Sequence, residues 1–261
     1  MVATASIILI ILNMILGFAV PIGLLIFFKV KYHASLKCYF TGCAVMLVFA
    51  FMLEQLVHTV VLRSAAGAAI QGNILLYALY GGLMAGLFEE TGRFLAMRFV
   101  LKKEQENDHN ALMYGAGHGG LEMFVLLSIG MINNLVYSLA LNMGQAESLL
   151  APLNDPARST LQAGFDALVN TPSWQFLLSP AERIAAITAQ IGLSVIVWFG
   201  AKQKKAGLRL LILAILLHAV LDAVSVIAAG SGMSLILVEV LIYLMAAGIA
   251  GIAVKVWCTQ E

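Results

Sequence analysis

Three clusters of ionisable residues lie inside otherwise apolar, helix-length runs of this 261-residue chain. Ionisable side chains cost several kcal/mol in a membrane and rarely stay there without a partner or a task. Within each cluster, residues three or four positions apart share a helix face, so a carboxylate can orient an imidazole or pair with a guanidinium. Such groups can carry out acid–base chemistry. The clusters are Glu89-Glu90 with Arg93 (EETGR), His118 with Glu122 (HGGLE) and His218 with Asp222 (HAVLD).

The two adjacent glutamates cannot have the same role. Neighbouring side chains on a helix point about 100° apart. Arg93 is within reach of either Glu89 or Glu90, because it follows them by four and three positions. One glutamate can therefore pair with Arg93 and stay ionised. The other can face a cavity and act as a general base.

The composition is that of an integral membrane protein. Hydrophobic residues make up 61% of the chain and charged residues 11%, and the mean hydropathy is +0.95. Ordinary soluble domains have about 25% charged residues. The formal net charge of +1 provides no basic stripe for nucleic acid. The cysteines Cys38, Cys43 and Cys258 form neither a disulfide framework nor a metal-ligand spacing.

Seven apolar runs are long enough to cross a bilayer, which takes about 20 residues. We therefore predict an all-α, polytopic helical bundle that forms one membrane domain over residues 1–261, in a bacterial cytoplasmic membrane. The predicted spans are 5–28, 38–60, 74–101, 110–141, 181–201, 208–228 and 233–257.

The basic residues predict the orientation of these spans, because cytoplasmic loops are enriched in lysine and arginine. Most of them lie in the first, third and fifth connections between spans and at the end of the last span. These connections are therefore predicted to be cytoplasmic, which places the N-terminus outside and the C-terminus inside. The predicted inner residues are Lys29, Lys31, Lys37, Arg98, Lys102, Lys103, Lys202, Lys204, Lys205, Arg209 and Lys255, against Arg63, Arg158 and Arg183 outside.

The fourth connection, 142–180, is the only long one, and it contains four of the five prolines. Asp155-Pro156, Thr171-Pro172 and Ser179-Pro180 each resemble an N-cap followed by proline at the first helical position. We therefore expect short helices on the outer surface, as a packed cap or, alternatively, as a substrate gate.

The three polar clusters are predicted to meet at one depth. With a rise of ~1.5 Å per residue, Glu89 and Glu90 lie roughly 17 Å from the cytoplasmic end of their span. The same estimate gives about 12–18 Å for His118 and Glu122. His218 and Asp222 come to about 15–21 Å, and Gln190 in the fifth span lies at a similar level. We expect the six residues Glu89, Glu90, His118, Glu122, His218 and Asp222 to line a single cavity.

The order of these motifs resembles a known family. EETGR, GHGGLE, the Glu182-Arg183 pair and HAVLD are similar to the YhfC family of glutamic-type intramembrane proteases. The PrsW peptidases are related, with the pattern EExxK, FxxxE and HxxxD. The CAAX-processing and bacteriocin-immunity membrane proteases are more distant. The likeness to YhfC covers nearly the whole chain and includes Glu54-Gln55 with His58.

The resemblance implies that Glu89 or Glu90 activates a water molecule, and we favour Glu89 because it is first in the motif. His118 would assist, while His218 and Asp222 would stabilise the oxyanion. Arg93 and Glu122 would have supporting roles. Related families often carry a histidine near Gln190. Glutamine cannot accept a proton as imidazole does, although it can donate a hydrogen bond to an oxyanion.

The leading hypothesis is therefore an intramembrane endopeptidase that acts on a peptide or membrane-protein substrate without a cofactor. Zinc is a minority alternative, because two histidines and several carboxylates can bind it. A non-catalytic peptide-binding or immunity protein, favoured by Gln190, is a second hypothesis. A proton-coupled transporter is a third, although paired halves with broken helices are not evident. Glu54, His58 and Glu239 are expected to be mainly structural, and the sequence does not indicate an oligomeric state.

Overall fold

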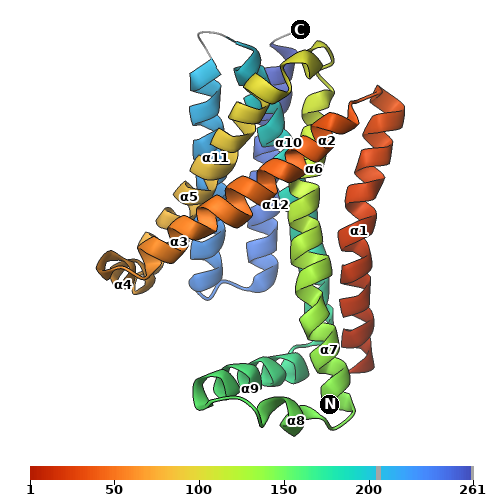
Figure 1. Ribbon diagram of the computed structural model, residues 1–261, viewed down its shortest axis with the longest axis vertical. Coiled ribbons are helices and arrows are strands. Elements are labelled where there is room, and N and C mark those ends of the chain that lie inside the picture. The colour runs from red at the N-terminus through yellow and green to blue at the C-terminus, as the bar shows by residue number, and fades with distance from the viewer. Residues whose placement is uncertain (204–206, 260–261) are drawn as a thin grey trace. The chain divides into compact units, whose positions relative to one another are not determined.

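The computed structural model describes residues 1–203 and 207–259, and in these ranges it contains helices and no strand (Figure 1). Lys204 and Lys205, which contribute to the predicted orientation, lie outside the described residues. The first elements are α1 (Thr4–Tyr32), α2 (Leu36–Val45), η1 (Met46–Glu54), α3 (Gln55–Leu62), α4 (Ala65–Gln71), α5 (Ile74–Leu95), η2 (Ala96–Val100) and η3 (Lys102–Glu106). They are followed by α6 (Asn110–Met123), η4 (Phe124–Ile129), α7 (Gly130–Asn142), α8 (Ala146–Leu150), α9 (Asp155–Asn170), η5 (Ser173–Leu177), α10 (Leu178–Lys202), α11 (Gly207–Gly230) and α12 (Leu235–Cys258).

The prediction of about seven membrane-spanning helices is confirmed. Among the described residues, 6 helices are long and apolar enough to cross a membrane, or up to 7 when a bent pair is included. The bent pair is Ala65–Gln71 with Ile74–Val100, which turn by 110°. The other spans are Thr4–Tyr32, Leu36–Leu62, Asn110–Asn142, Ser173–Lys202, Gly207–Gly230 and Leu235–Cys258.

Three spans contain a stretch of π-helix, which the apolar pattern did not predict. These stretches are η1, η2 and η4. η2 follows the helix that carries EETGR, and η4 follows the helix that carries HGGLE. π-Helical segments are uncommon and are often found at functional sites. Here two of the three stretches, η2 and η4, lie shortly after polar clusters.

The long fourth connection contains short helices, as predicted, but their caps differ from the prediction. Asn154, one residue before Asp155, caps α9 by accepting a hydrogen bond from the backbone N–H of Ala157. Thr171 instead ends α9, and Ser179 lies inside the first turn of α10. Each Asx or Ser/Thr residue before a proline was an equally good cap by type, so the sequence alone did not identify the true helix start.

The chain forms two compact units. One comprises residues 1–20 and 123–183, and the other comprises residues 21–122 and 184–261. In the first unit, Ser128 donates a hydrogen bond to the backbone of α1, and Asn13 donates to the carbonyl of Phe176. All three polar clusters belong to the second unit. The single domain over residues 1–261 stays a prediction.

In the second unit, α5 packs closely along α11 through glycine. A Cβ at Gly82 would lie 2.4 Å from the carbonyl oxygen of Ala219, and a Cβ at Gly86 would lie 2.6 Å from that of Ile215. Small residues of this kind let membrane helices approach at backbone distance. The close approach brings the EETGR motif of α5 next to the HAVLD motif of α11.

The orientation stays a prediction, and cysteine labelling can test it. In a background without Cys258, a cysteine at position 155 should react with an impermeant reagent added from outside. A cysteine at position 204 should react only from inside, because the basic residues cluster at that end of the spans. Labelling of both positions from the same side would contradict the topology.

Candidate active site

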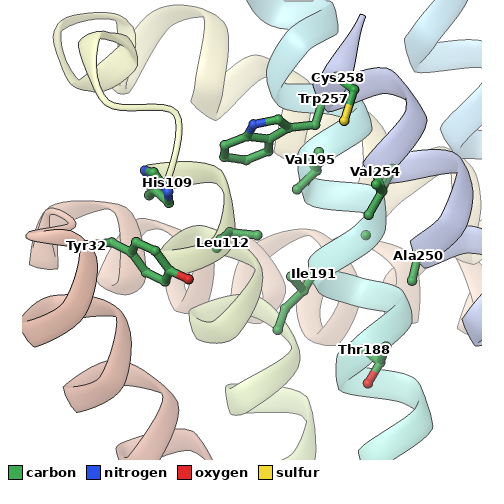
Figure 2. Close-up of a pocket in the computed structure, with 12 residues that line it drawn as sticks. Tyr32, His109, Leu112, Thr188, Ile191, Val195, Ala250, Val254, Trp257 and Cys258 are labelled. Carbon is green, nitrogen blue, oxygen red and sulfur yellow. The ribbon is translucent and has the colours of Figure 1, made fainter. Parts of the chain in front are cut away.

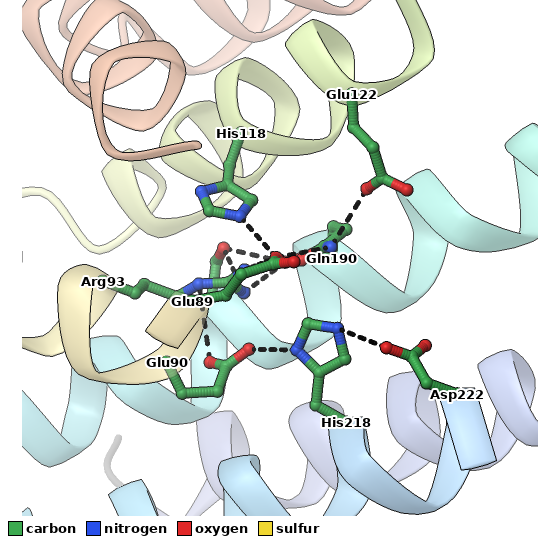
Figure 3. A network of polar contacts seen from close by, with 9 residues as sticks. Glu89, Glu90, Arg93, His118, Glu122, Gln190, His218 and Asp222 are labelled. Atoms are coloured by element: carbon green, nitrogen blue, oxygen red, sulfur yellow. Dashed lines mark hydrogen bonds and ion pairs between the residues drawn. The ribbon is translucent and has the colours of Figure 1, made fainter. Parts of the chain in front are cut away.

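The EETGR motif on α5 is almost completely removed from the surface. Glu89 is 6% exposed, whereas Glu90 and Arg93 are 0% exposed. These residues lie on the part of α5 that faces α6, α10 and α11, and Figure 3 shows side chains from all three helices converging on them. Buried charges must be paired or hydrogen-bonded, so their partners define the site.

Glu89 contacts α6 and α10. Its Oε2 atom lies 2.8 Å from Nε2 of His118 and accepts a hydrogen bond of 3.1 Å from Nε2 of Gln190 (Figure 3). His118 is itself completely buried. Glu89 is thus held at one oxygen by an imidazole and an amide, both from other helices.

Glu90 points in a different direction and contacts α11. Its Oε1 atom lies 2.8 Å from Nδ1 of His218, and the Nε2 atom of that ring lies 3.5 Å from Oδ2 of Asp222. The side chain of Asp222 is 38% exposed, so this carboxylate marks the accessible end of the pair. The adjacent glutamates therefore do have different environments, as their positions on the helix predicted.

Arg93 lies between the two glutamates and is closer to Glu90. Its Nε is 3.5 Å from Oε2 of Glu90, whereas its Nη2 is 3.9 Å from Oε2 of Glu89. The guanidinium also donates to α10, to the carbonyl oxygen and Oε1 of Gln190 and to Oγ of Ser194. A planar guanidinium suits such a set of fixed acceptors. Arg93 thus cross-links α5 to α10 and neutralises Glu90 more directly than Glu89.

Gln190 connects three charged residues. Its Oε1 accepts from Arg93, and its Nε2 donates to Oε2 of Glu89 and to Oε2 of Glu122, both at 3.1 Å. Arginine can only donate and an ionised carboxylate can only accept, so the amide has one consistent orientation. An imidazole at this position would lack this combination of one acceptor and two donors.

All eight residues predicted for the site are brought together in one polar network: Glu89, Glu90, Arg93, His118, Glu122, Gln190, His218 and Asp222. The network joins α5, α6, α10 and α11 within one unit. That six of these side chains also line one open cavity stays a prediction.

Two further residues at the site were missed by sequence reasoning. Ser194, which belongs to none of the sequence motifs, accepts from Arg93 and donates to the carbonyl of Gln190 at 2.7 Å. Tyr114 lies beside the network: it is completely buried, and its ring stacks on that of His118 with centroids 6.0 Å apart. The sequence did contain a clue to both residues. Ser194 follows Gln190 by four positions and Tyr114 precedes His118 by four, so each shares a helix face with a predicted site residue.

A second polar group lies beside this network. Nε2 of His58 is 3.0 Å from Oε1 of Glu54, and Nδ1 of His58 is 2.9 Å from the hydroxyl of Tyr80. Glu54 is buried and interacts electrostatically with Glu89 and His218. The expected structural role fits the link that His58 makes between α3 and α5. The proximity of Glu54 to the network was not expected.

The fold and site define a class of protein: a polytopic membrane protein with a buried acid–base network shared by four helices. A sequence model described as the YhfC intramembrane metalloprotease matches residues 16–243. The chain therefore belongs to the YhfC family, a family of intramembrane proteases. The uncharacterized membrane protein YhfC of Bacillus subtilis (strain 168) is 40% identical over 229 residues, which cover 87% of this chain and 86% of that protein. No solved structure matches the chain.

The family description implies a metal, but the donor atoms of this network do not fit one. Two ligands of a tetrahedral zinc ion, each about 2.0–2.2 Å from the metal, lie roughly 3.3 Å apart. His118 Nε2 and Glu89 Oε2 are 2.8 Å apart, which is a hydrogen-bond distance. The cationic Arg93 lies 3.9 Å from the same carboxylate oxygen. Within the described ranges, no three His, Cys, Asp or Glu side chains are grouped as a metal ion would require.

Proposed function

We propose that this chain is an intramembrane endopeptidase in which Glu89 activates the attacking water and no metal takes part. The observation that supports this most strongly is that the two adjacent glutamates have different contacts and different exposure. Glu90 is enclosed by Arg93 and His218, whereas Glu89 is further from the guanidinium and slightly exposed. Glu89 is thus the carboxylate better placed to accept a proton.

In the proposed reaction, Glu89 removes a proton from water as the water oxygen bonds to the peptide carbonyl carbon. The tetrahedral intermediate then loses its amine when the C–N bond breaks, and Glu89 returns the proton to the nitrogen. His118 holds the carboxylate of Glu89 in one orientation through their 2.8 Å contact. No covalent enzyme intermediate is needed, and the proton count balances over the cycle.

The developing oxyanion needs a hydrogen-bond donor, and His218 is best placed to supply it. Glu90 engages Nδ1 of the ring and fixes its orientation. Nε2 is directed toward Asp222 at the longer distance of 3.5 Å, near the accessible end of the network. A donor that is fixed before the reaction stabilises charge as it develops, and such donors are each worth about 10²–10³-fold in rate.

A non-catalytic peptide-binding function is the second candidate, because the contacts of Gln190 favour it. This amide is hydrogen-bonded to Arg93, Glu89 and Glu122, so it already occupies Oε2 of Glu89, an oxygen of the proposed general base. A site that binds a peptide without cleaving it would tolerate this arrangement. Under the protease proposal, the substrate carbonyl or the water must replace one of these contacts.

Metal removal tests the proposed mechanism. The purified protein should contain no stoichiometric zinc, and strong chelators should leave its cleavage of membrane-spanning peptides unchanged, because the network is neutralised by Arg93 rather than by a metal ion. Elemental analysis and cleavage assays before and after chelation measure this. Activity that disappears on chelation and returns with zinc would contradict the glutamate mechanism and support the metal alternative.

A further inference from the structure

A cavity lined by none of the eight network residues lies within the unit that contains the site. It has a volume of about 430 Å³ and is bounded by α1, α6, α10 and α12 (Figure 2). Sites for small molecules usually measure roughly 300–1,000 Å³. The lining residues are Tyr32, His109, Leu112, Thr188, Ile191, Gly192, Val195, Ala250, Ala253, Val254, Trp257 and Cys258.

One end of the cavity is aromatic. The rings of Tyr32 and His109 stack with centroids 4.2 Å apart, and the ring of Trp257 meets that of His109 edge-on at 5.4 Å. Tyr32 ends α1, Trp257 is next to the last residue of α12, and His109 precedes α6. Tyrosine and tryptophan at span ends are typical of the headgroup level of a membrane. This end of the cavity therefore lies at the interface between lipid and water.

The other end is apolar. Ile191 and Ala250 line it, together with the methyl-bearing Thr188. From Cys258 to Ala250, α12 advances by eight residues, so the slot extends ~12 Å into the membrane-spanning part. An alkyl chain fits a slot of this depth and lining better than a polar ligand does.

The aromatic end also carries two lysines. The ammonium of Lys31 lies 5.2 Å from the centroid of the Tyr32 ring and forms no ion pair with a carboxylate among the described residues. Lys255 is exposed and lies on α12 between the lining residues Val254 and Trp257. Lys202, by contrast, is paired with Asp108 at 2.6 Å. Each cation near a membrane surface attracts an anionic lipid by about 1 kcal/mol.

We propose that this cavity binds an anionic phospholipid, with one acyl chain in the slot and the phosphate near Lys31 and Lys255. The cavity lies behind α10, the helix that supports Arg93. Thr188, Ile191 and Val195 line the cavity, while Gln190 and Ser194 hold the guanidinium. The lipid thus packs against the helix that carries the site, and its binding does not depend on the proposed protease activity.

Fluorescence quenching of Trp257 tests this proposal without a substrate. A Trp174→Phe, Trp198→Phe background, in which Trp257 is the only remaining tryptophan, is reconstituted in nanodiscs of unlabelled lipid and titrated with phosphatidylglycerol brominated on its acyl chains. Brominated phosphatidylcholine serves as the zwitterionic comparison. We expect half-maximal quenching at about a thirtyfold lower mole fraction of the anionic lipid, because each of the two lysines contributes about a fivefold preference.

Two variants separate specific binding from ordinary contact with the bilayer. Ala250→Leu fills the slot and should remove the preference for the anionic lipid, and Lys31→Gln with Lys255→Gln should reduce it to about one. Arg63→Gln, which also removes positive charge but lies between α3 and α4, should leave it unchanged. Equal quenching by both lipids in the parent protein would overturn the proposal. If Ala250→Leu does not fold, the lysine double variant decides, and an unchanged preference there would overturn it too.

Discussion

Glu89→Gln is expected to reduce peptide cleavage by about 10²–10⁴-fold or more, while the variant still folds. Glutamine has the shape of glutamate but cannot accept the proton of the attacking water. Its amide can still contact His118, and Arg93 keeps its contacts with Glu90, Gln190 and Ser194. Single-turnover rates on a verified substrate, together with the melting temperature in detergent, measure the two properties separately.

The Glu90→Gln variant is expected to differ from it. Because Glu90 is fully buried and is the nearer partner of Arg93, its loss should mainly lower the yield and melting temperature of the folded protein. Glu147→Gln is a matched control, since the Glu147 side chain is 72% exposed. If Glu89→Gln and Glu90→Gln both cleave at the wild-type rate, the glutamate mechanism is wrong and the binding-protein hypothesis replaces it.

Arg93→Met is expected to be the most destabilising single change, at about 3–5 kcal/mol. It would leave two buried carboxylates without their shared cation and would remove three hydrogen bonds to α10. Arg93→Lys should recover only part of this loss, because an ammonium keeps the charge but not the planar set of donors. Thermal unfolding in detergent measures both variants.

A double variant identifies which glutamate is the main partner of Arg93. Adding Glu90→Gln to Arg93→Met removes the stranded carboxylate and should restore part of the lost stability. Adding Glu89→Gln should restore less, since its oxygen is 3.9 Å from the guanidinium rather than 3.5 Å. Equal stability of Arg93→Met and the wild type would show that this arginine does not hold the helices together.

The spans and the convergence of the clusters were predictable because they depend on local properties. The length of an apolar run can be read from the sequence and shows whether it can span a membrane. The depth of a residue in its span follows from counting residues along the helix. Those two quantities were enough to place Glu89, His118 and His218 at one level. This prediction can be made without knowing which helices are neighbours.

The pairing within the site was not predictable, because it depends on how each helix is rotated against the others. Gln190 was a doubtful substitute for histidine in the sequence, whereas the structure makes it a bridge between Arg93, Glu89 and Glu122. Ser194 and Tyr114 carry no motif of their own. Arg93 and Gln190 are 97 positions apart in the sequence, so no local pattern indicates their contact.

Cleavage of a library of membrane-spanning peptides in heavy-oxygen water tests directly whether Glu89 activates the water that attacks the peptide bond. Zinc-free wild-type protein and Glu89→Gln are compared in parallel, and mass spectrometry identifies the new termini. If Glu89 activates the attacking water, the wild type produces new carboxyl termini with one heavy oxygen atom incorporated, and Glu89→Gln produces none above background. Equal cleavage by both proteins, or cleavage only after zinc is added, would contradict this mechanism.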